Sequence, residues 1–276
     1  MPSSLPYEVR GPILKADNVS LTLGGRAILK DISFEIKDLY RPEAVCGQVV
    51  GLLGPSGIGK TQLFHILSGL RKPDSGSVRI GEQGTPVQRG MVGVVAQQYP
   101  LFEHRTVLSN LLVAGRLAGL TPDKARDKAQ ALLERFNLGE CASLYPAQIS
   151  GGQRQRVAIT QQMMCSEVLL LMDEPFSGLD CIALDKVQEL ISEVANSAEL
   201  NTIIVVTHDI SSALEIADTI WLLGRDCDPQ GKLLSGARIK ATYDLIERGL
   251  AWRKGISTEP AFLDLLKEIR DRFVTL

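Results

Sequence analysis

A glycine-rich segment of eight residues most constrains how this chain can fold. Residues 54–61 read Gly-Pro-Ser-Gly-Ile-Gly-Lys-Thr, and they lie between a short apolar run at 49–53 and a helical pattern at 61–69. Glycines allow the backbone N–H groups of such a turn to surround an anion, and the helix that follows adds the positive end of its dipole. The segment therefore predicts a strand, a phosphate-binding turn and a helix in direct succession.

Each residue type of this segment has a predicted role. Lys60 would place its ammonium group beside the β and γ phosphates of a bound nucleotide, and the hydroxyl of Thr61 would ligate Mg²⁺. The backbone of the other six residues would surround the phosphates: Gly54, Pro55, Ser56, Gly57, Ile58 and Gly59.

Further short apolar runs predict the rest of a sheet. They have the length of buried strands, and helical patterns such as 184–198 lie between several of them. Strands that alternate with helices indicate an α/β core with a mainly parallel sheet. The predicted strands are 49–53, 92–96, 168–172, 203–206 and 220–223.

Two parts of the sequence depart from this alternation. Stretches at 13–22 and 28–36 alternate in hydropathy on either side of Gly24-Gly25, which predicts an antiparallel β layer before the core. Residues 105–165 show helical spacing, with Thr121-Pro122 as a helix start. They predict a helical subdomain inserted into the α/β core.

The whole chain, residues 1–276, is predicted to form one domain with four consecutive parts. The first combines the β layer with the phosphate-binding core, the second is the helical subdomain, the third completes the core, and the fourth is a short C-terminal helical extension. Their predicted bounds are 13–104, 105–165, 166–231 and 232–276.

Two adjacent carboxylates end one of the predicted buried strands. Asp173 and Glu174 follow the apolar run 168–172. Ligands of open α/β sheets bind at the carboxyl ends of the strands. Asp173 is therefore predicted to hold Mg²⁺, and Glu174 to act as the general base that activates a water molecule.

The segment Ile149-Ser-Gly-Gly-Gln-Arg-Gln-Arg-Val157 resembles the signature sequence of ATP-binding cassette (ABC) ATPases. Other positions match the motifs of this family in the same order. Gln97 resembles the glutamine of the Q-loop, Ser177-Gly-Leu-Asp180 resembles the D-loop, and His208 resembles the switch histidine. The resemblance covers roughly residues 13–225. It implies an α/β P-loop NTPase fold, with a RecA-like parallel core, an N-terminal antiparallel β layer and an inserted helical subdomain.

The resemblance also implies a site shared between two chains that bind ATP and Mg²⁺. Two cassettes, either two copies of this chain or this chain and a related ATPase, would face each other head to tail. Each ATP would lie between the phosphate loop of one and the signature segment of the other. The signature residues that would contact the γ-phosphate are Ser150, Gly151, Gly152 and Gln153.

Four further residues acquire roles by resemblance alone. His208 would hydrogen-bond the γ-phosphate, and Gln97 would reach Mg²⁺ and the attacking water. Asp180 would connect the two nucleotide sites across the interface. Leu23 occupies the position where the family usually has an aromatic residue that packs on adenine. An aliphatic side chain there still covers the base but loses the aromatic contribution of about 0.5–1.5 kcal/mol.

Amino-acid composition argues against a nucleic-acid partner and against a membrane-spanning helix. Hydrophobic residues make up 45% and charged residues 22%, as in ordinary globular proteins. The formal net charge is −2, so bulk charge offers nucleic acid no attraction, and no nucleic-acid partner is predicted. No apolar run approaches the ~20 residues that a membrane-spanning helix needs.

The resemblance to ABC ATPases further implies an ATPase subunit that energises transport through partner transmembrane subunits, located peripherally at the cytoplasmic face of the cell membrane. Residues 101–104 and 212–218 resemble importer subunits, especially those of the nitrate, sulfonate and taurine type. The resemblance then also implies a substrate-binding receptor. The alternative is a soluble ABC-type ATPase with a nucleic-acid or regulatory role.

Overall fold

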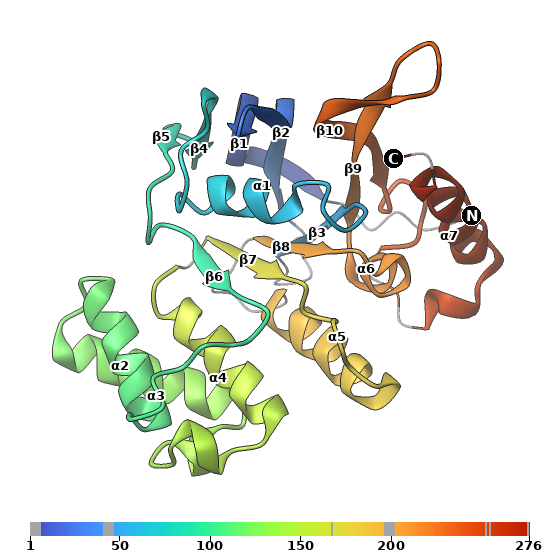
Figure 1. Cartoon of the computed structure of the whole chain (residues 1–276). Coiled ribbons are helices and arrows are strands. Elements are labelled where there is room, and N and C mark those ends of the chain that lie inside the picture. Colours follow the sequence, from blue (N-terminus) through green and yellow to red (C-terminus); the bar gives the residue numbers. More distant parts are fainter. Residues whose placement is uncertain are drawn as a thin grey trace.

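One mixed sheet organises the molecule (Figure 1). The computed structural model describes residues 7–40, 47–166, 168–195, 202–251, 253, 255–274 and 276. Within these residues the sheet has ten strands, in this order: β5 (Thr85–Pro86), β4 (Ser75–Ile80), β1 (Glu8–Leu23), β2 (Arg26–Tyr40), β10 (Leu233–Asp244), β9 (Thr219–Cys227), β3 (Gln48–Leu53), β8 (Thr202–Thr207), β7 (Leu169–Asp173) and β6 (Gly93–Val95).

The five strands from β9 to β6 are parallel and form the core of the α/β fold. Every residue of β3 and β8 is buried, because both faces of this part of the sheet are covered. The five apolar runs expected to be strands are therefore confirmed, with boundaries shifted by a few residues. Parallel pairing places the carboxyl ends of β3, β7 and β8 at one edge of the sheet.

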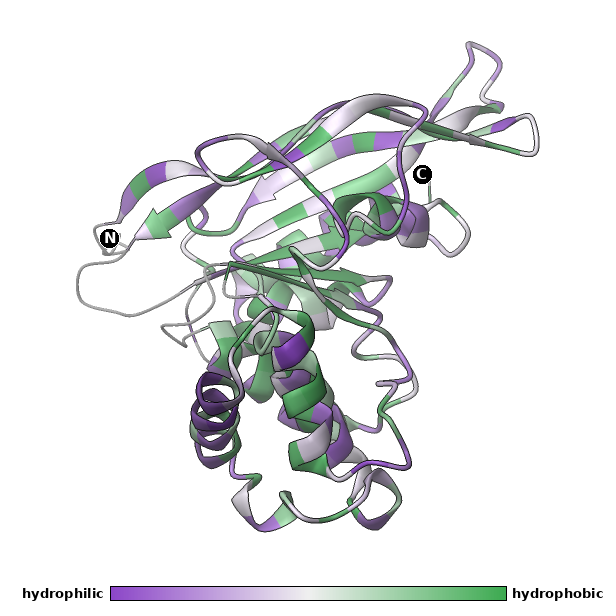
Figure 2. Ribbon diagram, turned by 90° about the vertical axis from the view of Figure 1, so that its left-hand side faces the viewer, coloured by the Kyte–Doolittle hydropathy of each residue, from purple (hydrophilic) through white to green (hydrophobic). Residues whose placement is uncertain are grey.

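The remaining strands form a mainly antiparallel layer. β1 and β2 pair around Gly24 and Gly25, whose φ angles of 56° and 76° suit a tight hairpin turn that other residues disfavour. This confirms the predicted antiparallel stretches. Figure 2 shows long strands with alternating hydrophilic and hydrophobic residues in this layer, and more uniformly hydrophobic strands beneath it.

The C-terminal region differs from the predicted helical extension, because it begins with strand β10. This strand pairs antiparallel with β9 and parallel with β2, where Ala237 lies opposite Leu29. Residues 237–244 of this strand alternate between apolar and polar side chains, a strand signal that the sequence analysis missed. The helix predicted from the apolar stripe that ends at Phe273 is present as α7 (Pro260–Phe273), which follows the short 3-10 helix η3 (Ile256–Thr258).

Helices cover both faces of the parallel strands. α1 (Lys60–Leu67) packs its apolar side chains between the parallel strands and the antiparallel layer. On the opposite face lie α5 (Cys181–Ala195), α6 (Ile210–Ile216) and α7. Alternate residues of β3 pack into the apolar clusters on the two faces of the sheet. Val50 and Leu52 face α1, whereas Val49 and Leu53 face α5, α6 and α7.

A helical lobe projects from the sheet, as the sequence predicted (Figures 1 and 2). It contains α2 (Val107–Leu117), α3 (Pro122–Arg135), η1 (Gly139–Cys141), η2 (Pro146–Gln148) and α4 (Gly151–Met163). Helix α4 joins this lobe to the sheet, since the Gln162 Oε1 atom accepts a hydrogen bond of 3.1 Å from the backbone N–H of Val94. In the part of the chain that the structure describes, no helix has the length and hydropathy to cross a bilayer.

Candidate active site

The phosphate loop connects β3 to α1, as the glycine pattern predicted. Gly57 and Gly59 have φ angles of 75° and 115°, which side-chain-bearing residues rarely adopt. A Cβ atom on Gly54 would come within 2.8 Å of the carbonyl oxygen of Leu223, and one on Gly59 within 3.0 Å of the Ile28 side chain. Three glycines are therefore required by backbone conformation or by close approach, and the loop is held against both β9 and β2.

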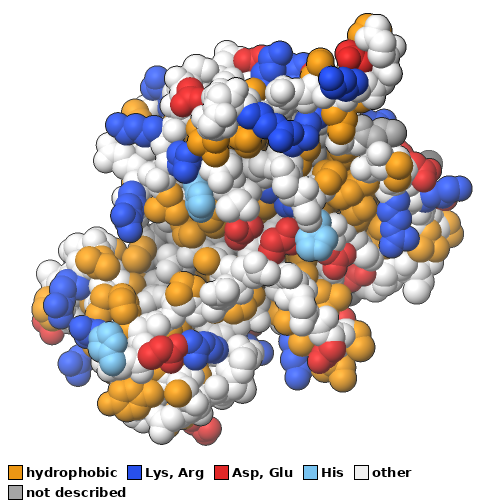
Figure 3. All heavy atoms as spheres, in the orientation of Figure 1, with side chains coloured by type: hydrophobic (Ala, Val, Ile, Leu, Met, Phe, Trp, Pro, Cys, Tyr) orange, Lys and Arg blue, Asp and Glu red, His pale blue; other side chains and the backbone are white. Residues whose placement is uncertain are grey.

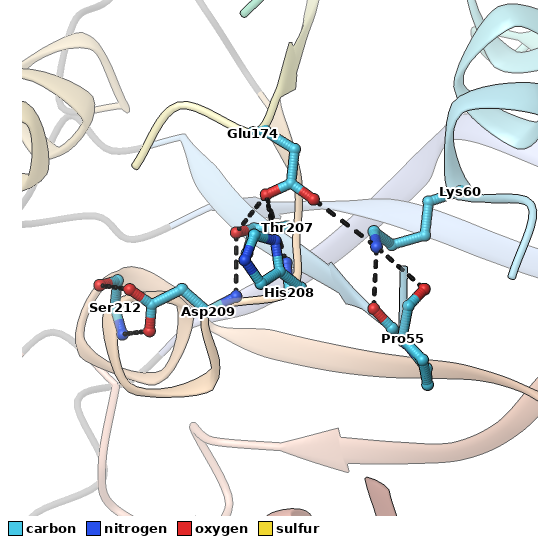
Figure 4. A network of polar contacts seen from close by, with 8 residues as sticks. Pro55, Lys60, Glu174, Thr207, His208, Asp209 and Ser212 are labelled. Atoms are coloured by element: carbon cyan, nitrogen blue, oxygen red, sulfur yellow. Dashed lines mark hydrogen bonds and ion pairs between the residues drawn. The ribbon is translucent and has the colours of Figure 1, made fainter. Parts of the chain in front are cut away.

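Lys60 begins α1 and folds its side chain back over the loop (Figure 4). Its Nζ atom donates hydrogen bonds to the carbonyl oxygens of Gly54 at 2.8 Å and Pro55 at 3.3 Å. The same atom lies 3.6 Å from Oε1 of Glu174. Burial lowers the pKa of Lys60, and the nearby carboxylate of Glu174 opposes that shift. The ammonium group thus lies inside the loop, where a bound phosphate would place its oxygens.

Glu174 directly follows β7 and is held by the end of β8. Its backbone N–H donates to Val206 O at 2.7 Å, and its φ angle of 49° is left-handed. Its Oε2 atom accepts a hydrogen bond of 3.0 Å from Thr207 Oγ1 and lies 2.9 Å from His208 Nδ1. A carboxylate can only accept, so Nδ1 of His208 carries the proton in this contact. The predicted general base and the predicted switch histidine are brought together.

Asp173 supplies the feature expected of a cation ligand. Its Oδ1 atom is buried and has no hydrogen-bond partner among the described residues. Burial raises the pKa of Asp173, and the adjacent Glu174 carboxylate raises it further. A buried carboxylate oxygen without a partner is costly unless a cation or water binds it. The orphaned oxygen, with the exposed hydroxyl-bearing Thr61 as the second residue of α1, fits Mg²⁺, which prefers oxygen ligands.

Gln97 lies at the same edge of the sheet. It follows β6, which pairs in parallel with β7 so that Val95 lies opposite Met172. Gln97 is therefore carried toward the edge where Asp173 ends β7, on an exposed turn. Its position agrees with the predicted role, and its contacts with a ligand stay a prediction.

The signature segment begins helix α4 in the helical lobe. Ser150 is the N-cap: its hydroxyl accepts a hydrogen bond of 3.2 Å from the N–H of Gln153, and Gln153 Oε1 accepts one of 2.8 Å from the N–H of Ser150. Gly151 and Gly152 are exposed, and a Cβ atom on either would meet nothing within 4 Å. The hydrogen bonds recorded for these residues all stay within the lobe, and none of them reaches the phosphate loop of the same chain.

Asp180 and Leu23, two other predicted site residues, lie on other elements than Lys60, Glu174 and His208. Asp180 is exposed and directly precedes α5, and its Oδ1 atom accepts a hydrogen bond of 2.8 Å from Ala183 N. Leu23 ends β1 and is half-buried, packed on the cluster that lines α1. Because Ile28 of the same hairpin contacts Gly59, the hairpin that carries Leu23 adjoins the phosphate loop.

Thr207 was missed by the sequence analysis. It is fully buried at the end of β8, donates to the carboxylate of Glu174 and accepts a hydrogen bond of 3.1 Å from Asp209 N. The available signal was its place immediately before His208 at the carboxyl end of a buried strand. Figure 3 shows acidic side chains and a histidine gathered at the middle of this face, between the upper part rich in lysine and arginine and the lower helical part.

Comparison with known proteins agrees with this geometry. A family model described as ABC transporter matches residues 29–177. The sulfate/thiosulfate import ATP-binding protein CysA of Synechocystis sp. is 36% identical over 210 residues, which are 75% of this chain and 57% of that protein. The "Probable sulfate/thiosulfate import ATP-binding protein CysA" of Chlorella vulgaris is also 36% identical, over 75% of this chain and 85% of its own length. The chain thus spans only about 57% of the length of the first of these relatives.

Solved structures with the same fold were also found. The ATP-binding cassette MJ0796, determined as a dimer in a post-hydrolysis state with ADP and Pi, is 27% identical with a TM-score of 0.64. That match covers 84% of this chain and 99% of the other. The cbiO1 protein of Clostridium perfringens, part of the cbiONQ complex, has a TM-score of 0.71 over 94% of this chain and 100% of its own, at 24% identity. The second likeness concerns the fold alone.

Proposed function

Since the chain belongs to the ABC transporter family, we propose that it is an ATP-binding and ATP-hydrolysing subunit that energises import through transmembrane partner subunits. The observation that carries this proposal is the placement of Lys60 in the phosphate loop beside Glu174. A cation that lies within the loop and a carboxylate aligned with it are the groups needed to bind a γ-phosphate and to activate water next to it.

Each side chain of the site would take one step in hydrolysis. On nucleotide binding, Lys60 exchanges its bonds to Gly54 O and Pro55 O for bonds to phosphate oxygens. Glu174 is thereby released from the ammonium group and accepts the proton of the attacking water. His208, which is half-exposed, turns its imidazole from Glu174 to the γ-phosphate. Mg²⁺, held by Asp173 and Thr61 with Gln97 nearby, would neutralise charge on the phosphate oxygens.

The site is proposed to be completed by a second cassette. Ser150 and the exposed N–H groups of Gly151 and Gly152 form a helix N-terminus that suits an anion. Because none of their recorded hydrogen bonds reaches the phosphate loop of their own chain, the γ-phosphate that they contact would belong to the facing chain. Asp180, exposed at the start of α5, would then lie at the interface between the two sites.

The membrane partners are proposed to bind at the helical lobe. Phe102 exposes 42% of its surface and Leu117 exposes 79%, and both lie in or next to this lobe. Large exposed apolar side chains of this kind are common at protein interfaces. The relatives named above are import ATP-binding proteins, which supports a peripheral position at the cytoplasmic face of the membrane and a substrate-binding receptor in the complete importer.

The proposal is tested with the variant Glu174→Gln. Light scattering coupled to size-exclusion chromatography, with ATP and Mg²⁺ present, should show a stable dimer for this variant and a monomer for the wild type. Release of phosphate should fall by about 10² to 10⁴-fold, the usual contribution of a general base. Glu189→Gln, an exposed position on α5, is the control and should behave as the wild type. Unchanged hydrolysis in Glu174→Gln would contradict the role of Glu174.

A second measurement separates transport from other ATPase roles. Wild-type protein should be recovered with washed membranes only when integral membrane subunits are present. Stimulation of its ATPase activity by nucleic acid or by ribosomes, without any membrane association, would instead support the alternative non-transport function.

A further inference from the structure

The hydroxyl of Tyr99 joins three segments that are far apart in the sequence. It accepts a hydrogen bond of 2.8 Å from Gln155 Nε2, on helix α4 of the helical lobe. It donates a hydrogen bond of 3.3 Å to the carbonyl oxygen of Pro175, immediately after Glu174. Tyr99 itself lies two residues after Gln97, in the turn that follows β6. One oxygen atom thus connects the lobe, the Gln97 turn and the segment that carries the general base.

The backbone around Tyr99 is shaped to hold this position. Tyr99 has a left-handed φ angle of 47°, which is uncommon for an aromatic residue, and its N–H donates to Ala96 O at 3.0 Å. Its ring packs on the apolar cluster that is shared by the helical lobe and the face of the sheet covered by α5, α6 and α7.

On the lobe side, the partner of Tyr99 is close to the signature segment. Gln155 is 6% exposed and lies on α4 five residues after Ser150, the N-cap of that helix. Helices are stiff over such a short length. A displacement of Ser150 along or across the helix axis is therefore transmitted to Gln155, and from Gln155 to the Tyr99 hydroxyl.

On the sheet side, the hydrogen bond fixes the backbone beside Glu174. Glu174 has a strained left-handed conformation, held by its N–H bond to Val206 O and by the bond of 3.2 Å from Ser177 N to its own carbonyl oxygen. The bond from Tyr99 to Pro175 O adds a constraint from outside this turn. These three bonds fix the backbone from which the Glu174 carboxylate extends toward Thr207, His208 and Lys60.

We propose that Tyr99 is a positioning residue that sets the Glu174 carboxylate according to the position of helix α4. The inference rests on the proposed ATPase function, and it assigns to the Tyr99 hydroxyl the connection between the signature segment and the general base of the same chain. Tyr99 makes no recorded contact with Lys60 or the phosphate loop, so it should act on the catalytic step and leave nucleotide binding unchanged.

The first test is Tyr99→Phe, which removes the hydroxyl and keeps the ring. The kcat for ATP hydrolysis should fall at least about fivefold, since small displacements of a catalytic group are costly, whereas the KM for ATP should stay unchanged. Tyr40→Phe, at an exposed tyrosine at the end of β2, is the matched control and should leave kcat unchanged. A wild-type kcat in Tyr99→Phe would overturn the inference.

A double variant distinguishes loss of positioning from a fall in kcat that is caused only by destabilisation of the fold. Tyr99→Phe leaves the buried Gln155 amide without its recorded partner, which by itself destabilises the fold. Adding Gln155→Met replaces the orphaned amide with an apolar side chain of similar length, so the thermal midpoint should recover. If kcat stays low in the double variant, the hydroxyl connection is required. If kcat recovers together with stability, the positioning role is overturned.

Amide hydrogen exchange tests the connection without relying on catalysis. In the double variant, exchange at residues 174–177 should be faster than in the wild type, while exchange elsewhere in the sheet stays unchanged. If the wild type fails to hydrolyse ATP but this acceleration is seen, the proposed function fails and the Tyr99 connection stands. Unchanged exchange at 174–177 overturns the connection whatever the ATPase activity.

Discussion

Lys60 and Glu174 face each other across the phosphate loop, with Nζ of the lysine 3.6 Å from Oε1 of the glutamate. The other carboxylate oxygen of Glu174 is shared by Thr207 and His208. Without nucleotide, the Glu174 carboxylate therefore pairs with the Lys60 ammonium group, which would otherwise bind phosphate. Nucleotide binding and release of the base are then one event, since the phosphate must displace the carboxylate from Lys60.

This competition predicts the effect of Glu174→Gln on affinity. Loss of the carboxylate frees Lys60 from its largely buried ion pair, so a non-hydrolysable ATP analogue should bind more tightly, by about fivefold for each ~1 kcal/mol that the pair contributes. Calorimetric titration of the monomer with the analogue measures this. Weaker binding than the wild type would show that Glu174 assists nucleotide binding and does not compete with it.

Asp173→Asn should increase the stability of the nucleotide-free protein and abolish its hydrolysis. A folded-state pKa raised above the unfolded value means that the charged carboxylate destabilises the fold at neutral pH, and that stability increases as pH falls toward that pKa. The amide removes this penalty, so the thermal midpoint should rise by about 2 °C or more.

Thermal unfolding at pH 7 and at pH 5 measures this effect. The difference between Asp173→Asn and the wild type should shrink at the lower pH, where the Asp173 carboxyl takes up its proton more readily. A lower midpoint for the variant at pH 7 would contradict the interpretation of Asp173 Oδ1 as an orphaned atom.

Two helix caps provide a matched pair for testing the signature segment. Ser150 caps α4 and Thr106 caps α2, and each side chain accepts a hydrogen bond of 3.2 Å from the N–H three residues on. Ser150→Ala and Thr106→Ala should each lower the free energy of unfolding by about 1 kcal/mol. Only Ser150→Ala should also weaken the ATP-dependent dimer of the Glu174→Gln variant.

Sedimentation at several protein concentrations compares the two caps. Equal weakening by both variants would mean that Ser150 acts through helix stability alone. No weakening by either would remove Ser150 from the proposed γ-phosphate contact.

Leu23→Tyr should tighten ATP binding. Leu23 is half-buried on the hairpin that packs against the phosphate loop, and an aromatic ring at this position adds stacking on adenine worth about 0.5–1.5 kcal/mol, or roughly a twofold to tenfold change in Kd. Leu234→Tyr, at a leucine on β10 that is 46% exposed, is the control. Titrations with ATP and GTP should show the gain for Leu23→Tyr only, and unchanged or weaker ATP binding would place the base elsewhere.

Local patterns in the sequence were sufficient to predict much of the fold and the site. The loop that ends at Lys60, the acidic pair at the end of β7 and the histidine after β8 depend on residues that are adjacent in the chain. Parallel pairing of strands then brings these ends to one edge, as the strand–helix alternation implied.

The features that escaped prediction depend on contacts between distant residues. Strand β10 is placed in the sheet by hydrogen bonds to both β2 and β9, although its alternating residues 237–244 already carried a strand signal. The bridge from Tyr99 to Gln155 and Pro175 joins positions 56 and 76 residues apart. No periodicity in the sequence encodes such a bridge, and only the assembled fold reveals it.

The position of β10 also has a consequence for how the chain is made. The hairpin β1–β2 emerges before the parallel strands during synthesis, yet it reaches them through β10, in which Ala237 pairs with Leu29 about two hundred residues earlier. The edge of β2 that pairs with β10 therefore stays unpaired until residues 233–244 have left the ribosome. Non-local pairing of this kind slows folding. A chaperone that shields exposed strand edges should accordingly bind nascent chains that stop short of residue 233, and release those that extend beyond residue 244.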